Sequence, residues 1–151
     1  MIRDKAAQET VLFHLGIPRL VYFLYRVSAE QRPFRLELEL EPELHLDKAV
    51  PHAEAFADLV VDWIGMLQRH AGADEPSFLS LAMFRQDGKL HVILDYEGSY
   101  AERPVRERYE QSAAFIACRW PDATTAAEFS DGQLTVRLQI PLIAAQEVAR
   151  A

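Results

Sequence analysis

Apolar residues recur along most of the chain with the three- and four-residue spacing of helices or the two-residue spacing of strands. Residues 18–30 are apolar around most of their circumference and begin with a proline. This segment is therefore expected to form a helix that is deeply buried or covered by a partner. Helices are also expected over 4–15, 51–71 and 104–117, and the second of these has one broad apolar face.

Strict alternation marks the clearest strand. Residues 34–40 alternate between apolar and polar, which directs the apolar side chains to a core and the others to solvent. The polar row continues into four carboxylates, which form either a solvated strand edge or a metal or partner site: Glu37, Glu39, Glu41 and Glu43. Two Asp-Gly dipeptides, at 87–88 and 131–132, are hairpin signals. They predict strands over 77–85, 89–96, 126–130 and 133–140.

This order of elements predicts an α/β (α+β) fold built as a two-layer sandwich. Because hairpins dominate, the sheet is expected to be mixed and mostly antiparallel, with about five strands and with the helices on one face. We expect one domain over 16–142, a helical stump or linker over 1–15, and a tail over 143–151.

Composition excludes several classes of function. The 151 residues carry a formal charge of −7 and no basic cluster, so binding to nucleic acid or to an acidic membrane surface is not expected. The single cysteine, Cys118, excludes an internal disulfide and a cysteine-based zinc site. The longest clean apolar run, 20–25, is far shorter than the ~20 residues of a membrane span, and no secretion signal precedes it. A cytoplasmic location is expected.

No catalytic residue or metal site emerges from the motifs. The five histidines form no pair at ligand spacing, and the isolated glycines cannot build a Walker or Rossmann loop. His14 could accept a phosphoryl group, but Leu15 and Gly16 follow it where a polar neighbour would be expected. We expect His91, within an apolar strand, to serve in packing or hydrogen bonding.

Several segments together resemble the ATPase-like domains of sensor histidine kinases. Residues 15–24 (LGIPRLVYFL) resemble the segment that enters this domain, and 34–40 follows at the expected distance. The helix over 52–71 occupies the place of the N-box helix, and 89–100 (KLHVILDYEGSY) resembles the strand that carries the nucleotide box. The closer resemblance, over roughly 12–142, is to the C-terminal domain of sporulation initiation phosphotransferase B, a degenerate relative.

The departures from the kinase pattern imply that no ATP or other cofactor is bound. The resemblance makes Asp95 and Gly98 a vestigial nucleotide box, in which Tyr96 and Glu97 replace the usual small and polar residues. Kinases hold the metal-bound nucleotide with an N-box asparagine, and this chain contains no asparagine. A glycine-rich lid around the triphosphate cannot be formed either.

The resemblance also implies a phosphoacceptor histidine on an upstream helical hairpin. Residues 1–15 are too short for that hairpin, and no His-Asp-Trp sequence occurs. The chain is then expected to be either a fragment or a natural variant without the transfer chemistry. Phosphotransferase activity is expected only if a histidine-bearing hairpin precedes it.

The resemblance therefore implies a catalytically silent, kinase-like domain of a sporulation phosphorelay, within two-component signalling. Its expected role is to support a homodimer and to help dock a response regulator. We expect Tyr22, Tyr25 and Arg26 to form the contact surface, although the helix that carries them could instead belong entirely to an intramolecular core. Three alternatives remain open: a small cytosolic enzyme, a nucleotide-binding kinase relative that uses Asp95 and nearby carboxylates, or a regulatory domain that only oligomerises.

Overall fold

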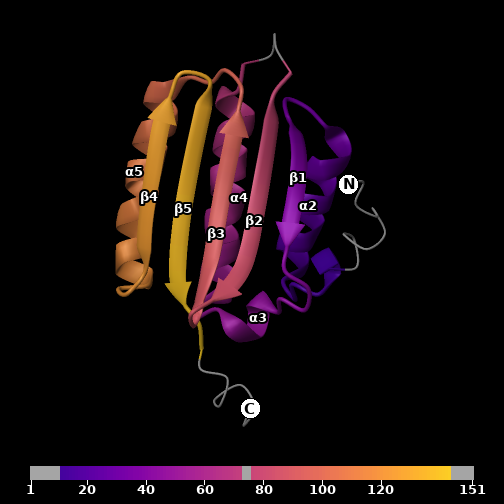
Figure 1. Ribbon diagram of the computed structural model, residues 1–151, viewed down its shortest axis with the longest axis vertical. Coiled ribbons are helices and arrows are strands. Elements are labelled where there is room, and N and C mark those ends of the chain that lie inside the picture. The colour runs from indigo at the N-terminus through magenta and orange to yellow at the C-terminus, as the bar shows by residue number, and fades with distance from the viewer. Residues whose placement is uncertain (1–10, 73–75, 144–151) are drawn as a thin grey trace.

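The protein forms a five-stranded sheet with helices on one face (Figure 1). The computed structural model describes residues 11–72 and 76–143. The elements are α2 (Pro18–Glu30), β1 (Arg35–Leu40), α3 (Leu46–Ala49), α4 (Ala53–His70), β2 (Phe78–Gln86), β3 (Lys89–Glu97), α5 (Glu102–Arg119), β4 (Thr124–Ser130) and β5 (Gln133–Pro141).

The strand order is β1-β2-β3-β5-β4, in which β1 and β2 are parallel and the other neighbours are antiparallel. The parallel pair is joined by a crossover through α3 and α4, because parallel strands cannot be connected by a tight turn. The helices α2, α4 and α5 lie behind the sheet, and none of the helices in the described residues covers its other face (Figure 1). The mixed, mostly antiparallel two-layer architecture expected from the sequence is thus confirmed.

The core lies between the helices and the covered face of the sheet. Along β3 the buried positions alternate with half-exposed ones, so every second side chain enters the core. Leu36 and Leu40 of β1 are buried as expected, whereas Leu38 is only partly buried. Leu12 and Leu15, which precede α2, belong to the same core.

The structure differs from the sequence-based prediction mainly at the ends of elements. The four-residue helix α3 was not expected, because one helical turn has no apolar period that a sequence pattern can show. Helix α5 begins at Glu102, two residues before Pro104, since a proline fits anywhere in the first turn, where its missing N–H is not needed. Strand β4 starts at Thr124, two residues before the expected 126.

The segments expected at the two ends of the chain, 1–15 and 143–151, are described only in part. Of the helix expected over 4–15, residues 11–13 are helical, and 1–10 lie outside the described residues. Leu142 and Ile143 donate backbone hydrogen bonds to Gly88 and Ala49, and 144–151 also lie outside that range. Within the residues described, no helix has the length and hydropathy needed to cross a bilayer.

Candidate functional site

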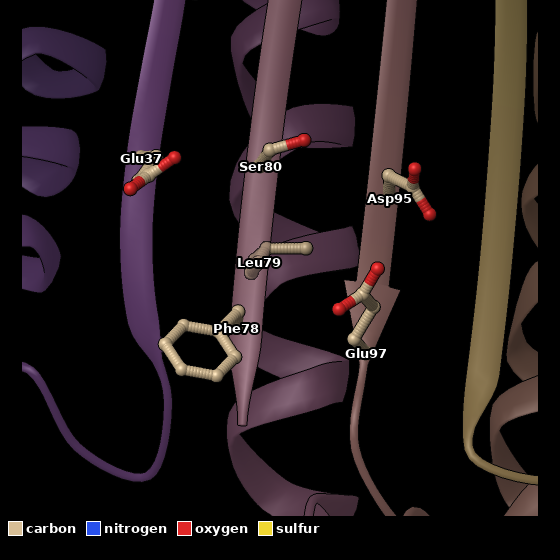
Figure 2. Close-up of a pocket in the computed structure, with 6 residues that line it drawn as sticks. All are labelled: Glu37, Phe78, Leu79, Ser80, Asp95 and Glu97. Atoms are coloured by element: carbon tan, nitrogen blue, oxygen red, sulfur yellow. The ribbon is translucent and has the colours of Figure 1, made fainter. Parts of the chain in front are cut away.

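Asp95, the first residue of the expected nucleotide box, lies on the uncovered face of the sheet. Its neighbours Leu94 and Tyr96 are buried under the helices, so alternation along β3 directs the Asp95 side chain away from α4. Figure 2 shows its carboxylate on the same side of the sheet as those of Glu37 and Glu97. Thr135 of β5 donates a hydrogen bond to Asp95 Oδ1 over 3.1 Å. Asp95 therefore does not line the space between α4 and the sheet.

Tyr96 fills that space at the end of β3. Its side chain is fully buried, packs edge-on against the rings of Phe34 and Tyr100, and donates a hydrogen bond from its hydroxyl to the Ser99 carbonyl over 2.7 Å. Burial raises the pKa of the Tyr96 hydroxyl above its ordinary value. An aromatic cluster therefore occupies the position where the sequence resemblance expects a nucleotide box.

Gly98 is required by the backbone and by its close neighbours. Its φ of +146° is a conformation that residues with a Cβ rarely adopt. A Cβ at this position would lie 2.5 Å from the Ser77 Cβ and 2.9 Å from the Tyr96 hydroxyl. The Gly98 N–H donates to the Gly132 carbonyl over 2.9 Å, which ties the end of β3 to the β4–β5 turn. This glycine is therefore explained by local packing.

The helix layer is joined by a buried hydrogen bond between α4 and α5. The Trp63 indole N–H donates to Ser112 Oγ over 2.8 Å, and Ser112 Oγ in turn donates to the Tyr109 carbonyl over 2.6 Å. Trp63 and Ser112 are both buried. This hydrogen bond thus holds α5 against α4, the helix that the sequence resemblance puts in the place of the N-box helix.

A hollow of about 360 Å³ lies at the surface between α4 and α5 and includes Asp58, Asp62 and Arg108 in its lining. Arg108 Nε donates to Asp62 Oδ2 over 3.0 Å, and this hydrogen bond raises the pKa of the guanidinium. Arg108 is already paired, and two carboxylates line the hollow. The hollow therefore lacks the positive charge that a triphosphate would need.

A second hollow, of about 260 Å³, lies on the uncovered face of the sheet (Figure 2). Its lining includes Glu37, Asp95 and Glu97 together with the hydroxyl of Ser80 and the ring of Phe78, which is 47% exposed. The outward direction of Glu37, predicted from the alternation in 34–40, is confirmed. The surroundings of this hollow are acidic, which is unfavourable for a phosphate group.

An apolar groove of about 530 Å³ runs beside α2 and is lined by Phe13, Gly16, Ile17, Pro18, Val21, Tyr22 and Tyr25. Phe13, Tyr22 and Tyr25 are 63%, 66% and 47% exposed and account for three of the four large apolar side chains found exposed among the described residues. Arg26 is exposed next to them and pairs with Glu30 over 3.7 Å. The structure thus brings Tyr22, Tyr25 and Arg26 together on one exposed surface.

The remaining candidates are two histidines and the single cysteine. His14 is exposed, and its ring stacks on that of His45 with 5.9 Å between centroids. His91 stacks on Phe84 and contacts the Gln86 carbonyl over 3.3 Å, in keeping with a packing and hydrogen-bonding role. Cys118 is exposed and free. In the part of the chain that the structure describes, no cluster of three or more acidic, histidine or cysteine side chains could hold a metal ion.

Comparison with known proteins identifies the fold. No protein-family model matches the chain, and no curated protein matches it in sequence. The histidine kinase domain of the blue-light activated kinase EL346 from Erythrobacter litoralis aligns with a TM-score of 0.59 and 15% identity, over 89% of this chain and 63% of that one. The chain therefore spans less than two thirds of that kinase domain.

Two structures of the histidine kinase ThkA give the same result. Its nucleotide-free catalytic domain aligns with a TM-score of 0.60 and 12% identity, over 83% of this chain and 92% of that one. ThkA in complex with the response regulator protein TrrA aligns with a TM-score of 0.53 and 10% identity, over 83% and 40%. The chain has the fold of histidine kinase catalytic domains.

Proposed function

We propose that this chain is a kinase-like domain that binds no nucleotide and acts through protein contacts in two-component signalling. In this proposal it is a phosphotransferase B-like component of a sporulation phosphorelay, which supports a homodimer and docks a response regulator. Asp95 and Gly98 are then remnants of a nucleotide box. The domain has no catalytic activity of its own, and phosphotransfer needs a histidine-bearing hairpin upstream.

The observation that carries this proposal is the direction of the side chains at the end of β3. Tyr96 occupies the helix-covered side, and Asp95 is on the opposite face among other carboxylates. A metal-bound triphosphate needs cationic or N–H donors around it, but the hollow between α4 and α5 presents two aspartates and an arginine already paired with one of them. The absence of asparagine from the sequence supports the same conclusion.

The proposed partner is supported by the fold and by one structural neighbour. ThkA, whose catalytic domain has this fold, has been solved in complex with the response regulator protein TrrA. The exposed rings of Tyr22 and Tyr25, with Arg26 beside them, offer apolar area of the kind that protein contacts require. Protein association and not chemistry is therefore the activity we propose.

A nucleotide titration tests the first half of the proposal. We expect no saturable binding of Mg-ATP to the chain up to ~1 mM by calorimetry, which corresponds to a binding free energy weaker than about −4 kcal/mol. The variant Asp95→Ala should behave in the same way. Measurable ATP affinity that is lost in Asp95→Ala would favour a nucleotide-binding kinase relative, and affinity retained in that variant would place a nucleotide site elsewhere. Either result contradicts the proposal.

A binding survey tests the second half. Each purified response regulator of the organism that encodes this chain is titrated against the immobilised protein up to ~100 μM, a limit that includes weak signalling complexes. We expect at least one regulator to bind, with weaker binding to Tyr22→Ala. If none binds in that range, the docking role is wrong.

A further inference from the structure

The exposed side of α2 carries a continuous apolar stripe. Pro18, Tyr22, Tyr25 and Ala29 are all exposed, and they follow one another at intervals of four, three and four residues. We refer to these four residues as the α2 stripe. At 1.5 Å per residue it runs for about 17 Å along the helix. Opposite it, Leu20, Val21, Leu24 and Val27 are buried against the rest of the domain.

The spacing of the α2 stripe is that of a seam between two packed helices. Alternating intervals of three and four residues keep side chains on the line where one helix meets another. The stripe is also symmetric from end to end, since its two large residues are central and its two small ones are terminal. A helix that approaches in the opposite direction with the same stripe would place Tyr22 against Tyr25 at the centre and Pro18 against Ala29 at both ends.

We propose that two copies of this chain associate through the α2 stripe, with the two α2 helices antiparallel about a two-fold axis. This inference refines the dimer-supporting role proposed above and rests on it. A two-fold interface requires a surface that is complementary to itself, and the order small, large, large, small meets that requirement. The apolar groove beside the stripe, between Phe13 and Val21, gives each tyrosine ring of the second copy a place to pack.

Charged residues of both signs line one flank of α2 beside the stripe. Arg19 and Arg26 each follow a stripe residue and lie on the same flank of α2. Arg19 is held by two carboxylates of α4, Glu54 at 2.8 Å and Asp58 at 2.8 Å, and the hydrogen bond that it donates to Glu54 raises the pKa of its guanidinium. This cluster has one carboxylate more than it has guanidinium groups.

Antiparallel pairing brings equivalent flanks together. The Arg26 guanidinium, whose contact with Glu30 is long at 3.7 Å, then lies beside the second copy's Arg19 cluster. The same contact forms twice, once on each side of the axis. Each Arg26 can then contact the surplus carboxylate of the second copy's cluster, and this contact favours the antiparallel register that the apolar residues define.

The size of the stripe sets the strength of association. Three helical turns bury less area than the roughly 1,200–2,000 Å² of a stable interface, so the dimer should be weak and should depend on concentration. We test this with sedimentation velocity of the whole 151-residue chain between ~10 μM and ~1 mM, the range in which a weak dimer dissociates. The mass should rise from 17.2 kDa toward twice that value.

Three variants locate the interface. The double variant Tyr22→Ala with Tyr25→Ala should weaken association at least tenfold, and Phe78→Ala, which removes an aromatic ring of similar exposure on the sheet, should leave it unchanged. Arg26→Glu should weaken association severalfold at low salt, and the difference from the unmodified chain should disappear near ~1 M salt, where charges are screened within about 3 Å. Circular dichroism verifies that each variant is folded.

The outcomes separate this inference from the function proposed above. A chain that stays monomeric to ~1 mM, or a dimer that survives the double tyrosine variant, overturns the inference. If the chain is monomeric and the same variant abolishes binding of a response regulator, the surface belongs to the regulator and the proposed function stands. If the dimer forms as described while no regulator binds, the inference stands and the docking role fails.

Discussion

Substitution of Ser112 by alanine tests whether a buried hydrogen bond holds α4 against α5. In the protein, Ser112 Oγ accepts the indole N–H of Trp63 over 2.8 Å, and both side chains are buried. Alanine has almost the volume of serine, so the substitution leaves no cavity but leaves the Trp63 N–H without an acceptor. An unsatisfied buried donor costs about 1–3 kcal/mol. We expect the free energy of unfolding to fall by that amount.

Urea denaturation followed by far-ultraviolet circular dichroism measures the loss directly. In thermal unfolding, each kcal/mol should lower Tm by about 2–4 °C in a domain of this size. Glu110→Ala, an exposed change two residues away on α5, serves as a control and should remain within about 0.5 kcal/mol of the unmodified protein. This comparison separates the hydrogen bond from a general effect of substitutions in α5.

A double-mutant cycle with Trp63→Phe isolates the pairwise contribution. Phenylalanine keeps an aromatic ring but has no N–H, so Ser112→Ala should cost about 1 kcal/mol less in that background than in the unmodified protein. If Ser112→Ala costs the same in both backgrounds, or less than about 0.5 kcal/mol in the unmodified protein, the hydrogen bond does not stabilise the helix layer. Packing of Trp63 alone would then account for the closed arrangement of the two helices.

Three further predictions concern the end of β3. Gly98→Ala should lower the free energy of unfolding by more than about 2 kcal/mol, because the positive φ and the 2.5 Å approach to the Ser77 Cβ act together; urea denaturation measures the change. Burial raises the pKa of Tyr96 and Tyr100, so their contribution to stability is complete below the ordinary pKa of about 10 and is lost as the pH rises through the folded values. The urea midpoint should therefore fall between about pH 9.5 and 11, and Tyr96→Phe should reduce that fall. Asp95→Asn should change stability by less than about 1 kcal/mol, because this half-exposed side chain accepts a single hydrogen bond from a neutral hydroxyl; thermal denaturation suffices to measure it.

The strands were largely predictable because each carries its signal locally. Alternation in 34–40 and the turns at Asp87-Gly88 and Asp131-Gly132 gave all five strands within about two residues of their observed ends. The exposed tyrosines of α2 also follow from the sequence, since a helix that is apolar all round must leave some apolar residues outside its buried face. The groove beside them does not, because it depends on Phe13 and on the loop at Gly16.

What the sequence did not show depends on contacts between distant residues. The bond between Trp63 and Ser112 joins positions 49 residues apart, and no local pattern marks either as a partner of the other. The reason for Gly98 is likewise not local in sequence, since Ser77 lies beside it immediately before the neighbouring strand β2. A resemblance to a nucleotide box accounts for a glycine at this position, but the structure shows that packing alone requires it.

The face on which Asp95 lies, by contrast, could have been read from the alternation of β3. Leu90, Val92, Leu94 and Tyr96 are each no more than 1% exposed, and Asp95 stands between the last two. To turn its carboxylate toward α4, the strand would have to slip by one residue, which would move all four apolar side chains to the uncovered face. At about 1.5–3 kcal/mol for each side chain, the slip costs at least about 6 kcal/mol, which is comparable to the whole stability of a typical domain. A short motif on a strand therefore identifies a site only when its side chains lie on the face of the strand that lines the site. Here the alternation of buried residues places Asp95 on the opposite face, outside any pocket between the helices and the sheet.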